Sequence, residues 1–295
     1  MNQTLEIALG TTQLGEMSED KALRLLSQSV DLGIEVFDTA PIYKLAETYL
    51  GTFYRQTSFP ITVNTKYGLP KPEIITESNI KESLERSLDR LSGIRIKTLF
   101  VHSLPISLLT NEVINYLKQF QKQGYFERLG YSGDNEDLKF AILKETFDDF
   151  MLTLNAIDLR NLDYIPLISN NQRIFIKRPL ANGIWKHWHL KQIQNSIFKM
   201  LGAGRANDPQ TYRFRFEKLK KSSPQIYEPR IETFTKLLGE LRFSKTIVFG
   251  TSKESHLLEI LRLLKIQDGE SDGSLFNQRL QIWQNFSHYK WQATR

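Results

Sequence analysis

The sequence alternates at regular intervals between short apolar runs rich in β-branched residues and longer amphipathic stretches. Such an alternation is typical of βα units that build a parallel sheet. The apolar runs predict eight strands, at residues 7–9, 34–38, 61–66, 98–102, 128–132, 150–155, 174–177 and 246–249. The amphipathic stretches predict helices at residues 19–32, 45–54, 78–91, 112–122, 136–144, 229–241 and 254–264.

Eight such strands in a chain of 295 residues fit one α/β barrel, which is usually slightly shorter than this chain. We therefore predict a single-domain (β/α)8 TIM barrel over residues 1–295. One connection breaks the rhythm, because residues 183–228 form a much longer loop after the seventh strand than the usual link. A long loop after a barrel strand often binds a ligand, so we predict a candidate substrate lid there. Near the end of the chain, Trp283 and Trp291 predict a C-terminal helix packed on the barrel.

The densest basic run of the chain lies inside this long loop and interleaves cations with aromatic rings. Its residues are Arg213, Phe214, Arg215, Phe216, Lys218, Lys220 and Lys221. A charge run of this kind is usually a solvated helix face. The alternatives are a contact for an anionic or sugar-derived substrate through Arg213, Arg215 or Lys218, and, less favoured, nucleic-acid binding through residues 213–221.

Composition limits the compartment and the partners. The formal net charge of +6 alone does not choose between nucleic acid, a membrane surface and an anionic small molecule. No apolar stretch is long enough for a membrane helix, and the polar N-terminus lacks the layout of a signal peptide. The chain has no cysteine, which excludes a disulfide framework or a thiolate metal site and fits a reducing compartment. We expect a cytoplasmic protein with no membrane or nucleic-acid partner.

Four chemically active side chains fall at or just after the ends of three consecutive predicted strands. Asp38 ends the second strand and Tyr43 follows it by five residues, while Lys66 and His102 end the third and fourth strands. Because parallel barrel strands end together at the C-terminal face, where chemistry collects, these side chains are expected to share one rim. Taken singly, Asp38 is as well explained as a helix cap, Tyr43 as a packing residue and His102 as a core histidine. All four together favour a catalytic site.

These groups suit the reduction of a carbonyl, in which hydride reaches carbon and the oxygen must be protonated. A tyrosine hydroxyl supplies this proton when an adjacent ammonium lowers its pKa from about 10, and a carboxylate keeps that ammonium charged. Lys66 and Asp38 fit these two roles beside Tyr43. A neutral imidazole at His102 would orient the carbonyl by donating a hydrogen bond.

At these residues the sequence resembles the aldo/keto reductase superfamily, and the resemblance extends over nearly the whole chain. The segment Asp38-Thr39-Ala40-x-x-Tyr43, with Glu47 and Leu50-Gly51 after it, is similar to the family signature. The resemblance implies a (β/α)8 barrel and an NAD(P)H-dependent oxidoreductase that reduces an aldehyde, ketone or sugar carbonyl. It also implies Tyr43 as the general acid and base, with Asp38, Lys66 and His102 tuning and orienting it.

The same resemblance implies the residues that hold the cofactor. They lie in the first loop, at the ends of the later strands and before the last barrel helix: Thr11, Thr12, Asp38, Ser132, Met151, Lys177, Arg178, Leu180, Gly250, Thr251, Ser252, Lys253, His256 and Glu259. Backbone N–H groups and hydroxyls at a helix N-terminus favour phosphate, which suits the last five of these. The chain has no Gly-x-Gly-x-x-Gly fingerprint, and this resemblance explains nicotinamide chemistry without one.

Four positions depart from the family pattern. Gly133 and Asp134 follow Ser132 where the family usually has Asn, and Met151 stands where a carboxamide-binding Gln is common. Lys177 stands where an aromatic ring often stacks on the nicotinamide, and His256 where an Arg often binds the 2′-phosphate. With Lys253 nearby, NADPH is the expected cofactor and NADH the alternative.

Two further patterns are set aside, and one rival function stays open. Gly10 and Gly15 have the spacing of a phosphate loop, but Glu16 and Met17 follow in place of Lys and Ser or Thr. His187 and His189 lack a third ligand at a suitable spacing, so no metal is expected. The rival is a non-catalytic, cofactor-binding barrel that acts as a regulatory subunit, although such a module would not need the four side chains. The oligomeric state is left open.

Overall fold

The computed structural model describes residues 5–70, 72, 74–183, 209–227, 231–241, 243–266 and 277–282. The chain divides into two compact units, and each is considered by itself. The barrel unit comprises Met1–Thr153, Arg160–Lys177 and Phe243–Leu261, and the second unit comprises Leu154–Leu159, Arg178–Arg242 and Arg262–Arg295. The prediction of a single domain stays a prediction.

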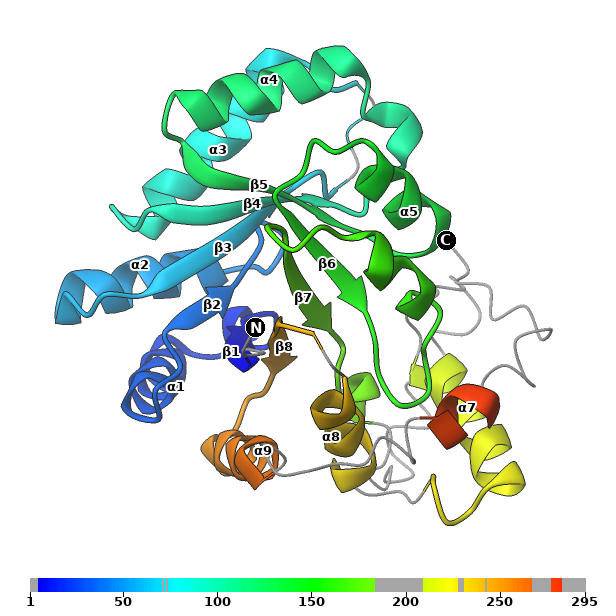
Figure 1. Ribbon diagram of the computed structural model, residues 1–295. Helices are drawn as coiled ribbons and strands as arrows, with labels where there is room; N and C mark the ends of the chain where they lie inside the picture. The colour runs from blue at the N-terminus through cyan, green and yellow to red at the C-terminus, as the bar shows by residue number, and fades with distance from the viewer. Residues whose placement is uncertain are drawn as a thin grey trace. The chain divides into compact units, whose positions relative to one another are not determined.

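All eight strands belong to the barrel unit and close into a parallel barrel in sequence order (Figure 1). They are β1 (Leu5–Gly10), β2 (Val36–Asp38), β3 (Thr62–Tyr67), β4 (Ile96–His102), β5 (Phe126–Ser132), β6 (Asp149–Thr153), β7 (Arg173–Lys177) and β8 (Lys245–Gly250). β1 closes the ring by pairing with β8 over six residues, from Leu5 opposite Lys245 to Gly10 opposite Gly250. The predicted (β/α)8 barrel is therefore confirmed.

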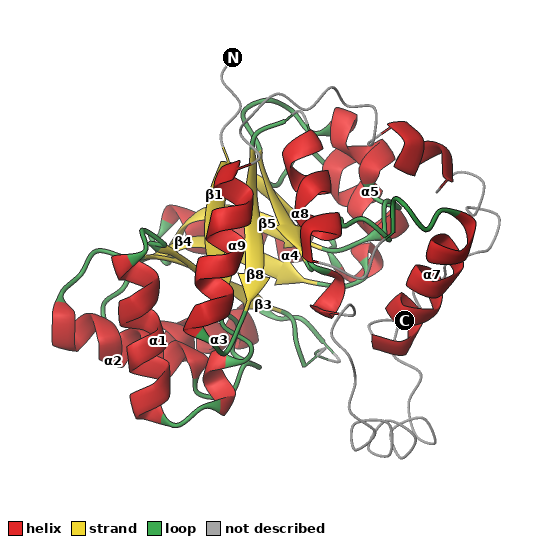
Figure 2. Ribbon diagram, turned by 90° about the horizontal axis from the view of Figure 1, so that it is seen from below, coloured by secondary structure: helices red, strands yellow, loops and turns green. Residues whose placement is uncertain are grey.

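Five described α-helices of this unit, and a sixth that belongs to it as far as Leu261, follow the strands, and Figure 2 shows α1, α3 and α9 outside the yellow strands. They are α1 (Glu19–Asp31), α2 (Ala46–Thr57), α3 (Glu77–Leu91), α4 (Asn111–Lys122), α5 (Asn135–Leu143) and α9 (Glu254–Ile266). Side-chain caps mark the start of two of them. The Thr76 hydroxyl accepts a hydrogen bond from the Asn79 N–H at the start of α3, and the Thr110 hydroxyl accepts one from the Val113 N–H at the start of α4. No described helix is both long and apolar enough to cross a membrane.

Side chains that point into the barrel form layers, because alternate residues of a strand face the same side. The middle layer is apolar and buried, and it consists of Ala8, Phe100, Met151, Phe175 and Val248, with Val36 packed against it. Two residues further along β2 and β4 stand Asp38 and His102, at the C-terminal mouth. A packed apolar layer thus separates the mouth from the opposite end of the barrel.

A buried carboxylate organises the N-terminal end of the barrel. The Asp149 side chain is fully buried and accepts hydrogen bonds from Arg128 Nε at 2.9 Å, Arg173 Nη2 at 2.6 Å and the Thr98 hydroxyl at 2.7 Å. Burial opposes its ionisation, but the bonds from Arg173 and Arg128 hold the pKa of Asp149 below its usual value. This cluster joins four strands at the N-terminal end of the barrel, where residues usually contribute to stability.

Among its described residues, the second unit contains α7 (Pro209–Ser222), α8 (Ile231–Glu240) and a helical segment at residues 277–282. The basic run falls on α7, and Lys221 is exposed there as predicted for a solvated face, but Arg215 is not. Arg215 is only 1% exposed, and its Nη1 lies 3.0 Å from Asp158 Oδ2. The expectation that Arg215 faces an anionic substrate or a nucleic acid is therefore wrong, because its charge is buried against a carboxylate of its own unit.

The remaining parts of the long loop and of the C-terminus are only partly described. Residues 184–208, which include His187 and His189, lie outside the described residues, as does the Arg213 side chain. Lys218 is half-buried. Residues 277–282 are helical, whereas Trp283 and Trp291 lie outside the described residues. The substrate lid stays a prediction.

Candidate active site

The four predicted catalytic side chains meet at the C-terminal mouth of the barrel. Asp38 ends β2, Lys66 is the penultimate residue of β3, and His102 ends β4. Tyr43 lies in the turn between β2 and α2, where its N–H donates to the Ala40 carbonyl at 2.9 Å and its own carbonyl accepts from the Ala46 N–H at 3.0 Å. The turn therefore brings the phenol back to the mouth.

Lys66 is the central group of this site, since its ammonium contacts both Asp38, which ends β2, and Thr39, which follows it. Its side chain is 2% exposed, and its Nζ donates to Asp38 Oδ2 at 2.6 Å and to the Thr39 carbonyl at 2.7 Å. Nζ also lies 5.0 Å from the centre of the Tyr43 ring. The ammonium is thus held between a carboxylate and a phenol.

The charges of this pair follow from burial and proximity. Burial lowers the pKa of Lys66, but the charge of Asp38 and the contact with Tyr43 outweigh it and hold the pKa above its usual value. Lys66 is therefore an ammonium at neutral pH. A fixed cation at this distance stabilises the negative charge that a phenol gains when it gives up its proton.

His102 completes the cluster and also lies beside the phenol. The Tyr43 and His102 ring centres are 6.3 Å apart, and the rings are nearly perpendicular at 87°. Tyr43 and His102 are both half-buried, so a small molecule can reach them, whereas Asp38 and Lys66 are buried. A carbonyl oxygen near the phenol would meet two polar groups, one from the turn after β2 and one from the end of β4.

Gly15 explains how the Tyr43 turn approaches the first loop so closely. A Cβ atom built on Gly15 would lie 1.8 Å from the Tyr43 carbonyl oxygen and 3.0 Å from the Ala46 nitrogen. Only glycine avoids this collision with backbone atoms. The second glycine of the rejected phosphate-loop pattern therefore serves the position of Tyr43, a role that sequence spacing did not indicate.

Buried polar atoms beside this cluster have acceptor capacity to spare. Among the described residues, Asp38 Oδ1, the Thr39 hydroxyl and Asn64 Oδ1 have no hydrogen-bond partner. Thr11, predicted to bind the cofactor, lies next to them, because its hydroxyl donates to the Asp38 carbonyl at 3.1 Å. Unpaired buried acceptors are costly, so this arrangement is suited to a ligand that donates hydroxyl or amide hydrogens.

The ends of β5, β6 and β7 carry a polar network that the sequence did not predict. Asp134 accepts from the Thr153 N–H at 2.8 Å and from Asn161 Nδ2 at 2.8 Å, and its Oδ2 lies 3.3 Å from Lys177 Nζ. Two of the departures from the family pattern, Asp134 and Lys177, thus form an ion pair. Ser132 is buried at the end of β5, two residues before Asp134.

Met151 does not reach this network. Its side chain is buried in the apolar middle layer beside Phe100 and Phe175. The rim position of β6 belongs to Thr153, two residues later, whose hydroxyl donates to Asp134 Oδ2 at 3.1 Å. Thr153 and Asp134, at the rim, are therefore better suited than Met151 to a polar contact with a nicotinamide amide group.

The predicted phosphate-binding residues gather between β8 and α9. The Thr251 hydroxyl and His256 Nδ1 share a hydrogen bond of 3.1 Å, and the Lys253 N–H donates to the same hydroxyl at 3.1 Å. Ser252, Lys253 and Glu259 are exposed on this side. The hydroxyls of Thr251 and Ser252, the Lys253 ammonium and the N-terminus of α9 are groups that favour an anion, whereas Glu259 is itself an anion.

The other predicted cofactor residues are more dispersed. Gly250 faces the first loop, because a Cβ atom built on it would lie 2.4 Å from Gln13 Oε1. Thr12 is exposed in that loop. Arg178 and Leu180 belong to the second unit, just after the end of β7.

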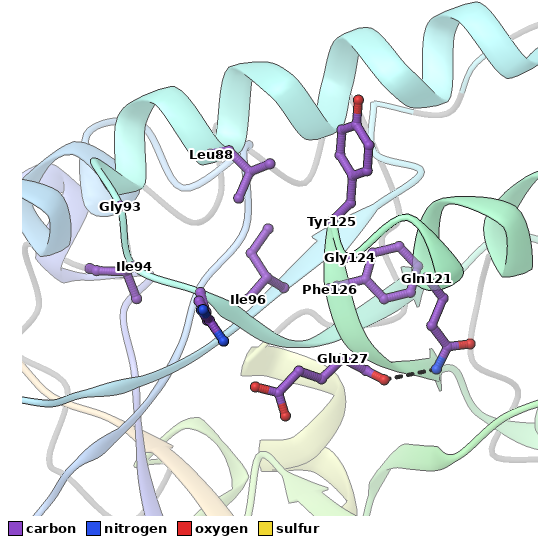
Figure 3. A pocket seen from close by; sticks show the side chains of 10 residues that line it. Leu88, Gly93, Ile94, Ile96, Gln121, Gly124, Tyr125, Phe126 and Glu127 are labelled. Carbon is purple, nitrogen blue, oxygen red and sulfur yellow. Dashed lines mark hydrogen bonds between the residues drawn. The ribbon is translucent and has the colours of Figure 1, made fainter.

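Figure 3 shows a cavity of about 630 Å³ that takes no part in this site. Ile96 and Phe126, which line it, are the first residues of β4 and β5, and Leu88 and Gln121 come from the ends of α3 and α4. The cavity is therefore at the N-terminal ends of the strands, whereas Lys66 and His102 stand at the C-terminal ends.

Comparisons with known proteins find similarities in sequence and in structure. The model of the "Aldo/keto reductase family" matches residues 6–156, just over half of the chain. The chain is 26% identical to the "Uncharacterized oxidoreductase YqkF" of Bacillus subtilis (strain 168), over 65% of this chain and 66% of that protein. It is 28% identical to the "L-galactose dehydrogenase" of Arabidopsis thaliana, over 58% of each chain. The matched part thus spans 66% of the first of these relatives and 58% of the second, less than two thirds of either.

Solved structures give the same fold. The holo form of the aldo-keto reductase AKR11C1 from Bacillus halodurans superposes with a TM-score of 0.71 at 23% identity. The likeness covers 95% of this chain and 91% of that one. At this identity it supports the barrel architecture.

Proposed function

Because this chain belongs to the aldo/keto reductase family, we propose that it is an NAD(P)H-dependent oxidoreductase that reduces the carbonyl of an aldehyde, ketone or sugar to an alcohol. The observation that carries this proposal is the position of Lys66 between the Asp38 carboxylate and the Tyr43 ring. A barrel that only bound the cofactor would have no use for this buried arrangement. The proposal therefore favours an enzyme over a regulatory subunit.

In the proposed reaction, Tyr43 gives its hydroxyl proton to the substrate oxygen. Lys66 stabilises the phenolate that remains, and Asp38 keeps Lys66 charged and in place. His102 donates a hydrogen bond to the same oxygen and so stabilises the negative charge that develops there. The phenolate then recovers a proton from solvent, which its half-buried position allows.

A bound nicotinamide would supply the hydride that reaches the carbonyl carbon. The residues present fit such a group, because Asp38 Oδ1 and Asn64 Oδ1 are buried acceptors without a partner in the described part of the chain. Thr11 and Asp38 would hold a sugar hydroxyl, and Ser132, Asp134 and Thr153 would hold the amide group. At the adenosine end of the cofactor, Thr251, Lys253 and His256 would hold the 2′-phosphate, which favours NADPH over NADH.

The substrate is proposed to be a small molecule that reaches Tyr43 and His102 at the mouth. The buried position of Arg215 removes one of the three cations that suggested an anionic substrate, so no charge is assigned to it. The complete absence of cysteine supports a reducing compartment such as the cytoplasm.

The test is to measure dinucleotide binding and carbonyl reduction with the whole chain. We expect NADPH to bind with a Kd in the micromolar range and to be consumed one for one with alcohol formed from at least one member of a panel of aldehydes, ketones and aldoses. Binding without turnover across the panel would favour the regulatory subunit. Failure to bind NADPH or NADH would overturn the proposal.

A further inference from the structure

A second ammonium group stands at the barrel mouth, on the side opposite Lys66. Lys177 ends β7, and Phe175, two residues before it on the same face of the strand, lies in the apolar middle layer. The Lys177 side chain must therefore point into the mouth, above that layer. It is only 15% exposed, so its charge is largely withdrawn from solvent.

Asp134 fixes the position of this ammonium. Its Oδ2 lies 3.3 Å from Lys177 Nζ, and the same carboxylate is anchored by the Thr153 N–H, the Thr153 hydroxyl and Asn161 Nδ2 at 2.8 to 3.1 Å. Asn161 is itself fully buried and also donates to the Thr153 carbonyl at 2.9 Å. A lysine is flexible when free, but this one is tied to a rigid network.

The Lys177 charge acts across the mouth. Burial raises the pKa of Asp38, and the charges of Lys66 and, to a smaller extent, Lys177 oppose that rise. Asp38 belongs to β2, and β1 and β8 separate β2 from β7 around the ring. A charged group that lies in the mouth between β2 and β7 therefore interacts electrostatically with the Lys177 ammonium.

We propose that Lys177 sets the relative affinity of the site for the two oxidation states of the nicotinamide cofactor, weakening the oxidised form. This inference rests on the proposed function. The oxidised ring carries a positive charge and the reduced ring is neutral, while the rest of the molecule is the same. A fixed cation at the mouth therefore repels only the oxidised form.

The charges of the mouth give the direction of each substitution. Two carboxylates, Asp38 and Asp134, face two ammonium groups, Lys66 and Lys177. Loss of Lys177 leaves this set with a net negative charge, which favours the oxidised ring. Loss of the Asp134 charge leaves it net positive, which disfavours that ring. The two substitutions are therefore expected to act in opposite directions.

The experiment is calorimetric titration of NADP⁺ and NADPH into the whole protein and its variants. We expect Lys177→Met to lower the ratio of the NADP⁺ Kd to the NADPH Kd about five- to tenfold, and Asp134→Asn to raise it. Lys177→Arg keeps the charge and is expected to leave the ratio within about twofold. Lys81→Met, on the exposed face of α3, is the matched control and should change nothing.

Two further measurements make the outcome decisive. The affinity for 2′-phospho-ADP-ribose, which has no nicotinamide ring, is expected to be the same in wild type and Lys177→Met. Circular dichroism shows whether each variant is folded, and Lys177→Arg tests the charge if Asp134→Asn unfolds. A ratio that Lys177→Met leaves unchanged, in a protein that binds both forms, would overturn the inference and leave the proposed function standing. Absence of binding by wild type would instead remove the proposed function.

Discussion

Lys66 combines two demands on one side chain, since it must be buried to act on Tyr43 and must be paired to remain charged. The Asp38 carboxylate, 2.6 Å from the ammonium, keeps it charged, and the Thr39 carbonyl accepts a second hydrogen bond from it. Burial of either charge alone would cost several kcal/mol. The pair is therefore both a structural and a chemical unit.

This coupling predicts different effects of one and two substitutions. Lys66→Met leaves Asp38 as an unpaired buried charge, so we expect the free energy of unfolding to fall by about 3 to 5 kcal/mol and kcat by at least about 100-fold. Adding Asp38→Asn should restore much of the stability and none of the activity. Thermal unfolding and steady-state kinetics measure the two effects. A Lys66→Met enzyme with kcat close to wild type would contradict the assigned role.

The sequence predicted the position of these residues on one rim better than the contacts around them. Asp38, Lys66 and His102 could be predicted because strand ends of a parallel barrel share one rim, and strand ends are visible as the ends of apolar runs. The Asp134 pair with Lys177 could not, because the two residues are 43 positions apart and only the closed barrel brings them together. Their joint departure from the family pattern was the one available signal.

At the scale of an element, the turn from β2 to α2 depends on the close approach of the first loop. A Cβ atom on Gly15 would lie 1.8 Å from the Tyr43 carbonyl oxygen, so Gly15→Ala must displace the turn. We expect kcat to fall roughly 10- to 100-fold, since a shift of about 1 Å at a reacting group has effects of that size.

Gly124→Ala is the control for this prediction. Gly124 has a positive φ of 84°, but its Cβ atom would meet open space far from the mouth. It should cost about 1 kcal/mol of stability and leave kcat unchanged. Equal kinetic effects of the two substitutions would show that Gly15 acts through stability alone.

We propose that the residues at the end of β8 and in the first turn of α9 determine the cofactor preference. His256 is held by the Thr251 hydroxyl beside Lys253, so a 2′-phosphate there would meet cationic or donor groups. We expect the double substitution Lys253→Glu and His256→Glu to lower kcat/KM for NADPH relative to NADH about tenfold or more, because it places negative charge beside the phosphate. Initial rates with each cofactor measure this ratio. No change in the ratio would show that the phosphate binds elsewhere.

Most elements were predicted within a few residues, but α7 (Pro209–Ser222) forms within the predicted long loop at residues 183–228. β2 begins at Val36, two residues later than predicted, because the Ile34 N–H donates to the Ser29 carbonyl and so belongs to the end of α1. β6 ends at Thr153, before Asn155, because Asn155 pairs with Asp158 in a tight turn. The basic run on α7 misled because Asp158, more than 50 positions earlier, neutralises Arg215.

At the scale of the whole barrel unit, the two ends do different work. The C-terminal mouth holds the reactive groups, whereas Asp149 ties β4, β5, β6 and β7 together at the opposite end. Because the pKa of Asp149 is held below its usual value, its stabilisation is fully present above the unfolded pKa of about 3.9 and is lost as pH falls through the folded value.

This sign gives a pH-dependent prediction. Asp149→Asn should lower the free energy of unfolding by about 2 to 3 kcal/mol at pH 7, a range that allows for the partial exposure of Arg128 and Arg173. The difference from wild type should narrow as pH falls below about 4. Urea unfolding at a series of pH values measures it, and a difference that is constant with pH would contradict the ionised state of Asp149.

The proposed function of the whole molecule depends on proton donation by Tyr43. The most direct test of this step compares Tyr43→Phe with wild type in two measurements on the same samples. We predict that the NADPH Kd changes by less than about threefold while kcat for carbonyl reduction falls by about 100- to 10,000-fold. Tyr116→Phe, remote on α4, should leave both unchanged. A Tyr43→Phe enzyme that binds NADPH normally and retains wild-type kcat would contradict the assignment of Tyr43 as the proton donor.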